Sequence, residues 1–268
     1  MKTTKRTIRL VALVILVIAL ISSCISIFSR YYQQYTDDEI FKELAANTSV
    51  VGKEHANTPS KAVSDESESN IVTDGDGTLL EYQTLYQENK DLYGWLKISD
   101  TIIDYPVMYS PSDPQFYLYK NFYKEDSVSG TPFILVPSDT NTIVYGHNMK
   151  NKSMFSSLLK YKDVEFWNNH KYIEFNTLTQ KGTYEIFIVS SEVVYYDESQ
   201  IPKGSYLFYE HPDLSLKEDF DDYISELSKH QYFNSETSAK YGNSLLTLVT
   251  CDYVQENSRL VIVAKRVD

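Results

Sequence analysis

The most reactive side chain in this sequence is the thiol of Cys251, which ends the apolar run SLLTLVTC and is followed by the polar Asp252. Alternation along an extended chain puts Cys251 on the same strand face as Val249, with the thiol at the strand end, where it can meet a substrate. A cysteine that packs as a small apolar side chain is the common alternative. A nucleophilic role for Cys251 therefore requires partners that generate and use its thiolate.

Arg259 is the first candidate partner, because it opens the next apolar run, RLVIVAKRV, after seven intervening residues. If the two runs form a hairpin in the simplest register, Cys251 lies opposite Arg259, with Cβ atoms about 4.5–5.5 Å apart. The same register pairs Val249 with Val261 and Thr247 with Val263. A guanidinium at this position could hold a substrate carbonyl and stabilise a developing oxyanion, and an exposed arginine at a sheet edge is the alternative.

His147 is the second candidate partner, because it follows the apolar run TIVYG and precedes a helical pattern. Gly146 permits a tight turn or a close backbone approach, which leaves the imidazole at a strand end, where it could protonate a leaving amine. The other four histidines lie in polar segments: His55, His170, His211 and His230. One Cys and one His fall short of the three or four ligands of a zinc site, so we expect no metal and no other cofactor.

The elements that would position these residues are mostly short strands. Runs of strand-forming residues bounded by turn signals occupy residues 95–98, 101–107, 131–136, 142–145, 171–175, 183–196, 244–251 and 259–266. Helical patterns occupy the stretch 78–96, where the helix is expected to end near Gly94, and residues 153–161 (with Ser153 as N-cap candidate), 163–168 and 214–230. Eight strands with peripheral helices predict a mostly β domain, as a barrel or a sandwich, with its longest helix before the cysteine strand.

The N-terminal segment predicts a membrane anchor. Residues 10–29 are uncharged over twenty positions, which is the length that a helix needs to cross a bilayer. Four basic residues precede this stretch and only Arg30 follows closely, so the N-terminus is expected in the cytoplasm and the rest outside the cell. A cleaved signal peptide is the alternative, although the stretch is too long and lacks an A-x-A-like site. Lipid attachment at Cys24 would also leave the domain tethered.

The rest of the chain divides at a change in composition. Residues 31–77 contain one short helical pattern and a run rich in Ser, Asp, Glu and Asn, which predicts a flexible extracellular stalk before a domain at 78–268. Without the five basic residues of the first thirty positions, 20 Lys and Arg remain against 37 Asp and Glu, a net charge of −17 that disfavours nucleic acid as a partner. Since Cys24 lies in the apolar stretch, no intramolecular disulfide is expected.

The motifs YGHNM, MFSSLLKY and TLVTCDY, an arginine eight residues beyond the cysteine, and GWLKI and IDYPV upstream occur in the order found in class B sortases. Over about residues 78–268 the sequence resembles these cysteine transpeptidases of Gram-positive bacteria. The resemblance implies an eight-stranded sortase-type β-barrel with N-terminal helices and one long helix before the cysteine strand. It carries His147, Cys251 and Arg259 onto the family's catalytic His, Cys and Arg.

The resemblance also implies a reaction and its partners. Cys251 would cleave a C-terminal sorting signal, of the NPxTN or (S/P)PxTG kind, after its threonine, and an amine of peptidoglycan or its precursor would resolve the resulting thioester. Candidate substrate contacts flank the nucleophile at Val249, Thr250 and Asp252, although many class B members have serine where this chain has Val249. Two alternatives remain open: a thiol hydrolase that uses water as acceptor, and an inactive anchored binding module.

Overall fold

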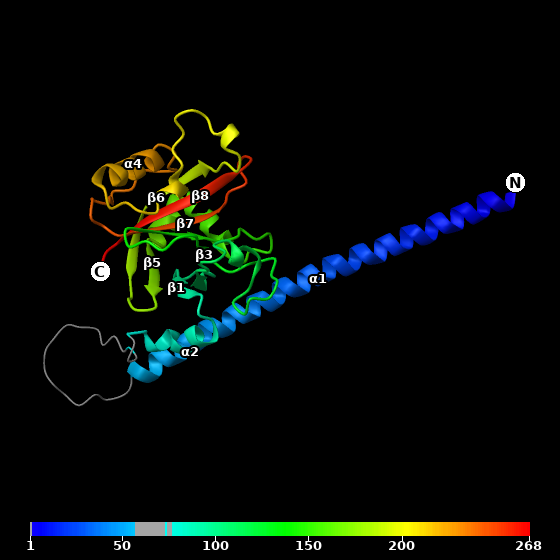
Figure 1. The fold of residues 1–268 in the computed structure, drawn as a ribbon, viewed down its shortest axis with the longest axis horizontal. Helices are drawn as coiled ribbons and strands as arrows, with labels where there is room; N and C mark the ends of the chain where they lie inside the picture. The colour runs from blue at the N-terminus through cyan, green and yellow to red at the C-terminus, as the bar shows by residue number, and fades with distance from the viewer. Residues whose placement is uncertain (1, 57–72, 74–76) are drawn as a thin grey trace.

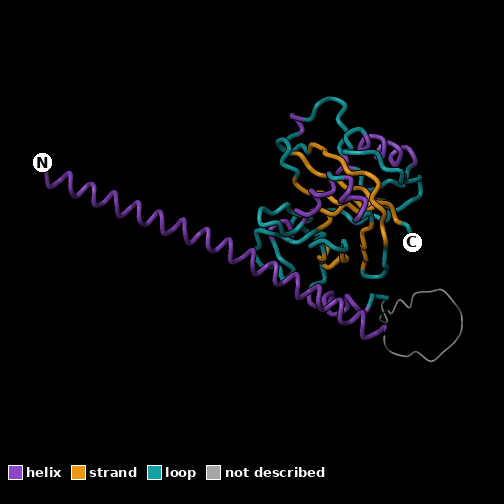
Figure 2. Tube along the Cα trace, turned by 180° about the vertical axis from the view of Figure 1, so that it is seen from behind, coloured by secondary structure: helices purple, strands orange, loops and turns teal. Residues whose placement is uncertain are grey.

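The computed structural model of this protein describes residues 2–56, 73 and 77–268. Eight strands close into a barrel in the order β1-β2-β3-β4-β7-β8-β6-β5, which confirms the predicted fold (Figures 1 and 2). The strands are β1 (Leu92–Lys97), β2 (Asp104–Met108), β3 (Phe133–Ile134), β4 (Asn141–Tyr145), β5 (Tyr172–Thr177), β6 (Thr183–Val193), β7 (Leu245–Cys251) and β8 (Ser258–Arg266). Strands β4 and β7 run parallel, and β8 is antiparallel to both β7 and β6.

Strands β7 and β8 read as continuous apolar runs because both of their faces are buried. One face contributes Leu248 and Ile262 to the larger hydrophobic cluster of the barrel. The other face packs Val249 and Val261 in a second cluster beneath helix α4 (Lys217–Ser228). Of the seven residues of β7, only the terminal Cys251 is not fully buried. The core therefore ends where the candidate chemistry begins.

The helices differ in their bounds from the sequence prediction. Helix α2 (Leu80–Glu88) ends before the predicted limit, because β1 begins at Leu92 and pairs with β2 and β5. The helical pattern that begins near Ser153 forms a 3₁₀ helix, η2 (Phe155–Lys162), without a side-chain cap. In α3 (Val164–Asn169) the cap is Asp163, whose carboxylate accepts hydrogen bonds from two backbone N–H groups. The remaining 3₁₀ helices are η1 (Phe116–Tyr119), η3 (Glu198–Gln200) and η4 (Phe208–Glu210).

Helix α1 (Lys2–Ala56) corrects the prediction of a flexible stalk for its last 26 residues, 31–56, which are helical in the structure. Phe41 and Leu44 are buried, and the Phe41 ring packs edge-on against Tyr105 of β2 at a centroid distance of 5.1 Å. These apolar side chains lie on the same helix face as the buried Asp37. This face of α1 packs against the barrel domain. Residues 57–72 and 74–76 of the predicted stalk lie outside the described residues.

The first part of α1 extends away from the barrel and from α4 (Figure 1). The part of the helix at Leu10–Thr48 is long and apolar enough to cross a membrane: its most apolar window of 18 residues has a mean hydropathy of 3.0 and is not buried by the rest of the protein. A signal sequence near the N-terminus would pass the same test. The helix is therefore compatible with a membrane anchor.

Candidate active site

Cys251 and Arg259 are direct partners in the antiparallel ladder between β7 and β8. The same ladder pairs Val249 with Val261 and Thr247 with Val263, so the predicted register is confirmed. Direct partners point to the same sheet face, where their Cβ atoms lie about 5 Å apart. Both side chains are half-buried. They lie on the sheet face that α4 covers at Val249 and Val261, but at the end of the two strands. The register therefore brings the thiol and the guanidinium to one partly exposed place.

His147 reaches this place from β4, the parallel neighbour of β7. Tyr145 is the register partner of Val249, and the Gly146 N–H donates to the carbonyl of Val249 at 3.1 Å. His147 and Cys251 each follow the Tyr145–Val249 pair by two residues, so the parallel register places them next to each other along the two strands. The next residue fixes this placement, because the Asn148 side-chain amide donates to the Cys251 carbonyl at 2.9 Å. His147, Cys251 and Arg259 thus follow or occupy three adjacent strands, β4, β7 and β8.

Gly146 is required for the close packing beneath this arrangement. A Cβ atom at Gly146 would lie 2.7 Å from the ring of Phe155, which is fully buried at the start of η2. The N–H of Phe155 in turn donates to the carbonyl of His147 at 2.9 Å. The chain on both sides of the imidazole is therefore held against the start of η2.

The imidazole of His147 is oriented by a backbone carbonyl. Its Nε2 lies 2.9 Å from the carbonyl oxygen of Leu118 in η1, and because a carbonyl only accepts, Nε2 carries the hydrogen. Burial lowers the pKa of His147 below its ordinary value, the Leu118 carbonyl opposes this change, and the positive charge of Arg259 lowers the pKa further. The resting ring is therefore mainly neutral, with Nδ1 left as the atom that can exchange a proton with the site.

Two tyrosines that the sequence did not single out complete the surroundings. Tyr196 accepts a hydrogen bond from Nη2 of Arg259, and the guanidinium also lies 6.0 Å from the centre of the Tyr196 ring. Nη1 of Arg259 donates to the Ser258 carbonyl at 2.9 Å, so the planar fork is held from two sides. Tyr253 is mostly exposed, and its hydroxyl donates to the carbonyl of Asn148 at 3.4 Å. Partial desolvation and interaction with the nearby Cys251 sulfur raise the pKa of Tyr253.

The three residues expected to contact substrate have buried side chains instead. Val249 packs in the cluster beneath α4, and the Thr250 hydroxyl donates to the Gly146 carbonyl at 2.8 Å. The Asp252 carboxylate is fully buried, where it pairs with Lys162 and accepts hydrogen bonds from Ser191 at 2.7 Å and from a tyrosine hydroxyl. These side chains offer no surface to a substrate, and their contacts fix the end of β7 on both sides of the thiol.

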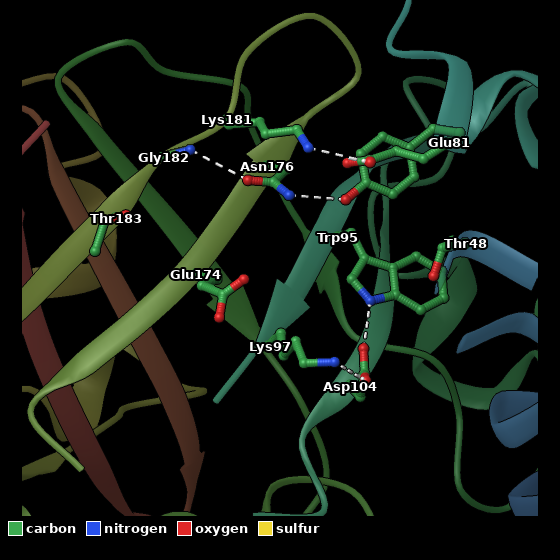
Figure 3. Close-up of a pocket in the computed structure, with 11 residues that line it drawn as sticks. Thr48, Glu81, Trp95, Lys97, Asp104, Glu174, Asn176, Lys181, Gly182 and Thr183 are labelled. Carbon is green, nitrogen blue, oxygen red and sulfur yellow. Dashed lines mark hydrogen bonds and ion pairs between the residues drawn. The ribbon is translucent and has the colours of Figure 1, made fainter. Parts of the chain in front are cut away.

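A cavity of about 310 Å³ between α2, β1 and β5 contains none of these residues (Figure 3). Its charged groups are largely paired with one another: Lys97 with Asp104 at 2.6 Å, and Lys181 with Glu81 at 3.1 Å. The indole N–H of Trp95 also donates to Asp104 at 2.7 Å. This cavity is therefore not the place where the candidate nucleophile acts.

Comparison with known proteins agrees with the motifs. The family model of the sortase domain matches residues 96–267. The chain is similar to Sortase B of Listeria monocytogenes serovar 1/2a (strain ATCC BAA-679 / EGD-e), with 34% identity over 196 residues that cover 70% of this chain and 74% of that protein. The crystal structure of Clostridium perfringens sortase B is 36% identical, with a TM-score of 0.60 and coverage of 69% of this chain and 99% of that one.

A third structure extends the likeness in fold. The Staphylococcus aureus sortase B–substrate complex has a TM-score of 0.68 and covers 88% of this chain and 99% of that one, at 23% identity. That level of identity shows a shared fold and no more. The family match and the two closer relatives show that the chain belongs to the sortase family, as a cysteine transpeptidase of class B.

Proposed function

We propose that this protein joins secreted proteins to the cell wall, with Cys251 as nucleophile, His147 as proton donor and Arg259 as the oxyanion-binding cation. The observation that carries the assignment is the ladder partnership of Cys251 and Arg259, with His147 two residues beyond the neighbouring strand pair. These are the residue types that thiol-based acyl transfer requires, because the thiolate attacks and a positioned acid releases the leaving group.

In the first half of the reaction, Nδ1 of neutral His147 accepts the proton of the Cys251 thiol, and the resulting thiolate attacks the threonine carbonyl of a sorting signal of the NPxTN or (S/P)PxTG kind. A C–S bond forms, and the carbonyl oxygen gains negative charge that the guanidinium fork of Arg259 stabilises through fixed N–H donors. The intermediate collapses as the C–N bond breaks, and the departing amine takes a proton from His147. The product is a thioester on Cys251.

In the second half, an amine of peptidoglycan or its precursor attacks the thioester carbonyl. Neutral His147 accepts the proton that the attacking amine loses, a C–N bond forms, and the C–S bond breaks. The released Cys251 thiolate takes the proton back from His147, which restores the resting enzyme. The low pKa of His147 supports this role, because a mainly neutral ring is ready to act as a base once the first product has left.

A cavity lined by residues of β6, the strand next to Arg259, supports the binding of peptide reactants. Glu192 of β6 is the register partner of Arg259, and it lines a space of about 380 Å³ together with Tyr206 and Gln255. Two strand spacings, about 10 Å, separate Glu192 from Cys251 across the sheet, a distance that three extended residues span. We infer that a reactant peptide with its reacting group at Cys251 extends into this space.

The proposed topology is a single membrane span with the N-terminus in the cytoplasm and the barrel outside the cell. The uncharged stretch at residues 10–29 within α1 and the basic residues before it support this orientation. An anchored transpeptidase would meet secreted substrates as they leave the membrane, close to the site of wall synthesis.

The test is a peptide-cleavage assay with product analysis. The full chain, purified in detergent, is incubated with fluorogenic peptides of both sorting-signal kinds, with and without an amine acceptor. We expect cleavage of one kind and an amide-linked product when the amine is present. A free acid as the sole product in both conditions would identify a hydrolase, and cleavage of neither peptide, where a control class B sortase is active, would refute the proposed substrate.

A further inference from the structure

Helix α1 is fastened to the loop between η1 and β3 by two polar side chains one turn apart. Asp37 is 2% exposed, and its Oδ2 accepts a hydrogen bond from the Ser127 hydroxyl at 2.6 Å. One turn earlier on the same helix face, the Gln33 side-chain amide donates to the carbonyl of Asp126. A buried carboxylate is costly unless it is hydrogen-bonded, so Asp37 marks a specific contact rather than incidental packing.

Ser127 is the centre of this loop. Its hydroxyl oxygen accepts from the N–H groups of Ser129 at 3.1 Å and Gly130 at 3.0 Å, while its hydrogen goes to Asp37. Its own N–H donates to the carbonyl of Tyr119 in η1 at 3.0 Å. The hydroxyl is therefore committed on all sides, and it joins α1, the loop and η1 into one unit.

Gly130, at the end of this loop, packs against the backbone carbonyl that contacts the active-site histidine. Its φ of +60° is a left-handed conformation that favours glycine, and an added Cβ would lie 2.5 Å from the carbonyl oxygen of Leu118. That same carbonyl oxygen is the partner of His147 Nε2 at 2.9 Å. The Leu118 carbonyl is thus confined between the loop that Ser127 holds and the imidazole of the site.

We propose that Asp37 is a positioning residue for His147: by holding Ser127, helix α1 keeps the Leu118 carbonyl against Nε2 of the imidazole. The inference rests on the role proposed for His147. Asp37 follows Ser29, the last residue of the uncharged stretch, by eight residues, which is about 12 Å along a continuous helix. The anchor helix is in this way part of the catalytic apparatus as well as a tether.

The groups that face His147 decide the sign of the effect. Arg259 of β8 lowers the pKa of His147 by its charge, and the Leu118 carbonyl raises it by accepting from Nε2. Tyr119 of η1 also faces the imidazole, with ring centres 5.6 Å apart, and the neighbouring Asn148 donates to the backbone carbonyl of Cys251 in β7. Loss of the carbonyl contact leaves burial and Arg259 to lower the pKa further.

The experiment measures the titration of His147 in the full chain in detergent micelles, by NMR of ¹³C-labelled histidine assigned with His147→Gln. We expect Asp37→Ala and Ser127→Ala each to lower the pKa of His147 by about 0.5 to 1 pH unit. The acidic limb of kcat/KM should move by the same amount, because protonation of His147 at low pH removes the base that accepts the thiol proton. Asp37→Asn keeps an acceptor oxygen for Ser127 and should restore the titration of the parent protein.

The matched control is Glu39→Ala, which removes a carboxylate from the exposed face of the same helix, where it pairs with Lys42. It should leave the titration unchanged. An unchanged pKa of His147 in folded Asp37→Ala and Ser127→Ala would overturn the proposal, and Ser127→Ala decides alone if Asp37→Ala does not fold. A shifted titration without any transpeptidation would uphold the positioning role and reject the proposed reaction.

Discussion

Arg259 lies directly opposite Cys251 across the β7–β8 ladder, and on its other side it lies directly opposite Glu192 of β6. Its guanidinium therefore projects from the middle strand of a three-strand row, beside the thiol, and its partner Glu192 lines a cavity. Tyr196 and the Ser258 carbonyl fix its orientation. A cation that is held before the substrate arrives can stabilise developing charge without reorganisation.

Replacement of Arg259 by lysine tests whether the fork, rather than the charge alone, is needed. Arg259→Lys keeps a positive charge but loses the hydrogen bonds to the Ser258 carbonyl and to Tyr196, and it loses the paired N–H donors of the guanidinium. We expect kcat to fall about 100-fold or more with a smaller change in KM, measured with the fluorogenic peptide. Arg266→Lys, at the far end of β8 where the arginine bonds to Asp268, should retain full activity. Undiminished kcat in Arg259→Lys would contradict the proposed role.

The lowered pKa of His147 predicts a pH dependence of stability. The unfolded chain binds a proton near pH 6.5, whereas the folded chain binds it only at lower pH. Stability therefore falls as the pH drops from about 6.5 towards the folded pKa, and this loss is absent above that range. Chemical denaturation from pH 8 to pH 5 should show a smaller decline for His147→Gln than for the parent protein. Parallel curves would contradict the lowered pKa.

Asp252 provides a prediction about stability rather than substrate affinity. Asp252→Ala removes a fully buried carboxylate and leaves Lys162 and Ser191 without their partner. We expect a loss of about 3 kcal/mol in the free energy of unfolding, with KM unchanged at temperatures where the variant is folded. Asp221→Ala, which breaks an exposed pair with Lys217, should cost less than about 1 kcal/mol. A raised KM in folded Asp252→Ala would restore its role as a substrate contact.

Gly146 predicts a loss of activity through crowding. Gly146→Ala places a Cβ against the buried Phe155 ring, so either the ring or the backbone before His147 must move. We expect the free energy of unfolding to fall by about 1–3 kcal/mol. We also expect a lowered kcat, because the imidazole is displaced from its position beside Cys251. Gly204→Ala is the matched control for activity, since nothing lies within 4 Å of an added Cβ there, although its φ of +86° strains the backbone. Normal kcat in folded Gly146→Ala would contradict this account.

The sequence predicted the strands and the register because both depend on side-chain pattern. The apolar runs that end at Cys251 and begin at Arg259 allow one simple hairpin, in which Val249 faces Val261, and the structure has that register. The end of the apolar run then placed the thiol at the end of the strand, and in the structure Cys251 is the residue of β7 that is only partly buried. Patterns of this kind are local in the chain and are therefore visible without coordinates.

The residues that surround the site were less predictable. The Leu118 carbonyl is a backbone group with no side-chain signature, and Tyr196 meets Arg259 from 63 positions away in the chain. Asp252 looked exposed because a charged residue usually is, yet Lys162 and Ser191 compensate its burial. The packing of α1 against the barrel was missed because it depends on few apolar side chains, such as Phe41 and Leu44, within a mostly polar segment. Asn148 was within reach, since it follows His147 directly.

The most direct test of the central claim is to trap the acyl enzyme on Cys251. The full chain is incubated with a sorting-signal peptide in the absence of an amine, and the intact protein is weighed by mass spectrometry before and after addition of the acceptor. We predict a thioester adduct of the cleaved peptide on Cys251 that disappears when the amine is added, and no adduct with Cys251→Ala. Cleavage that continues in Cys251→Ala, or an adduct that maps to another residue, would contradict the account.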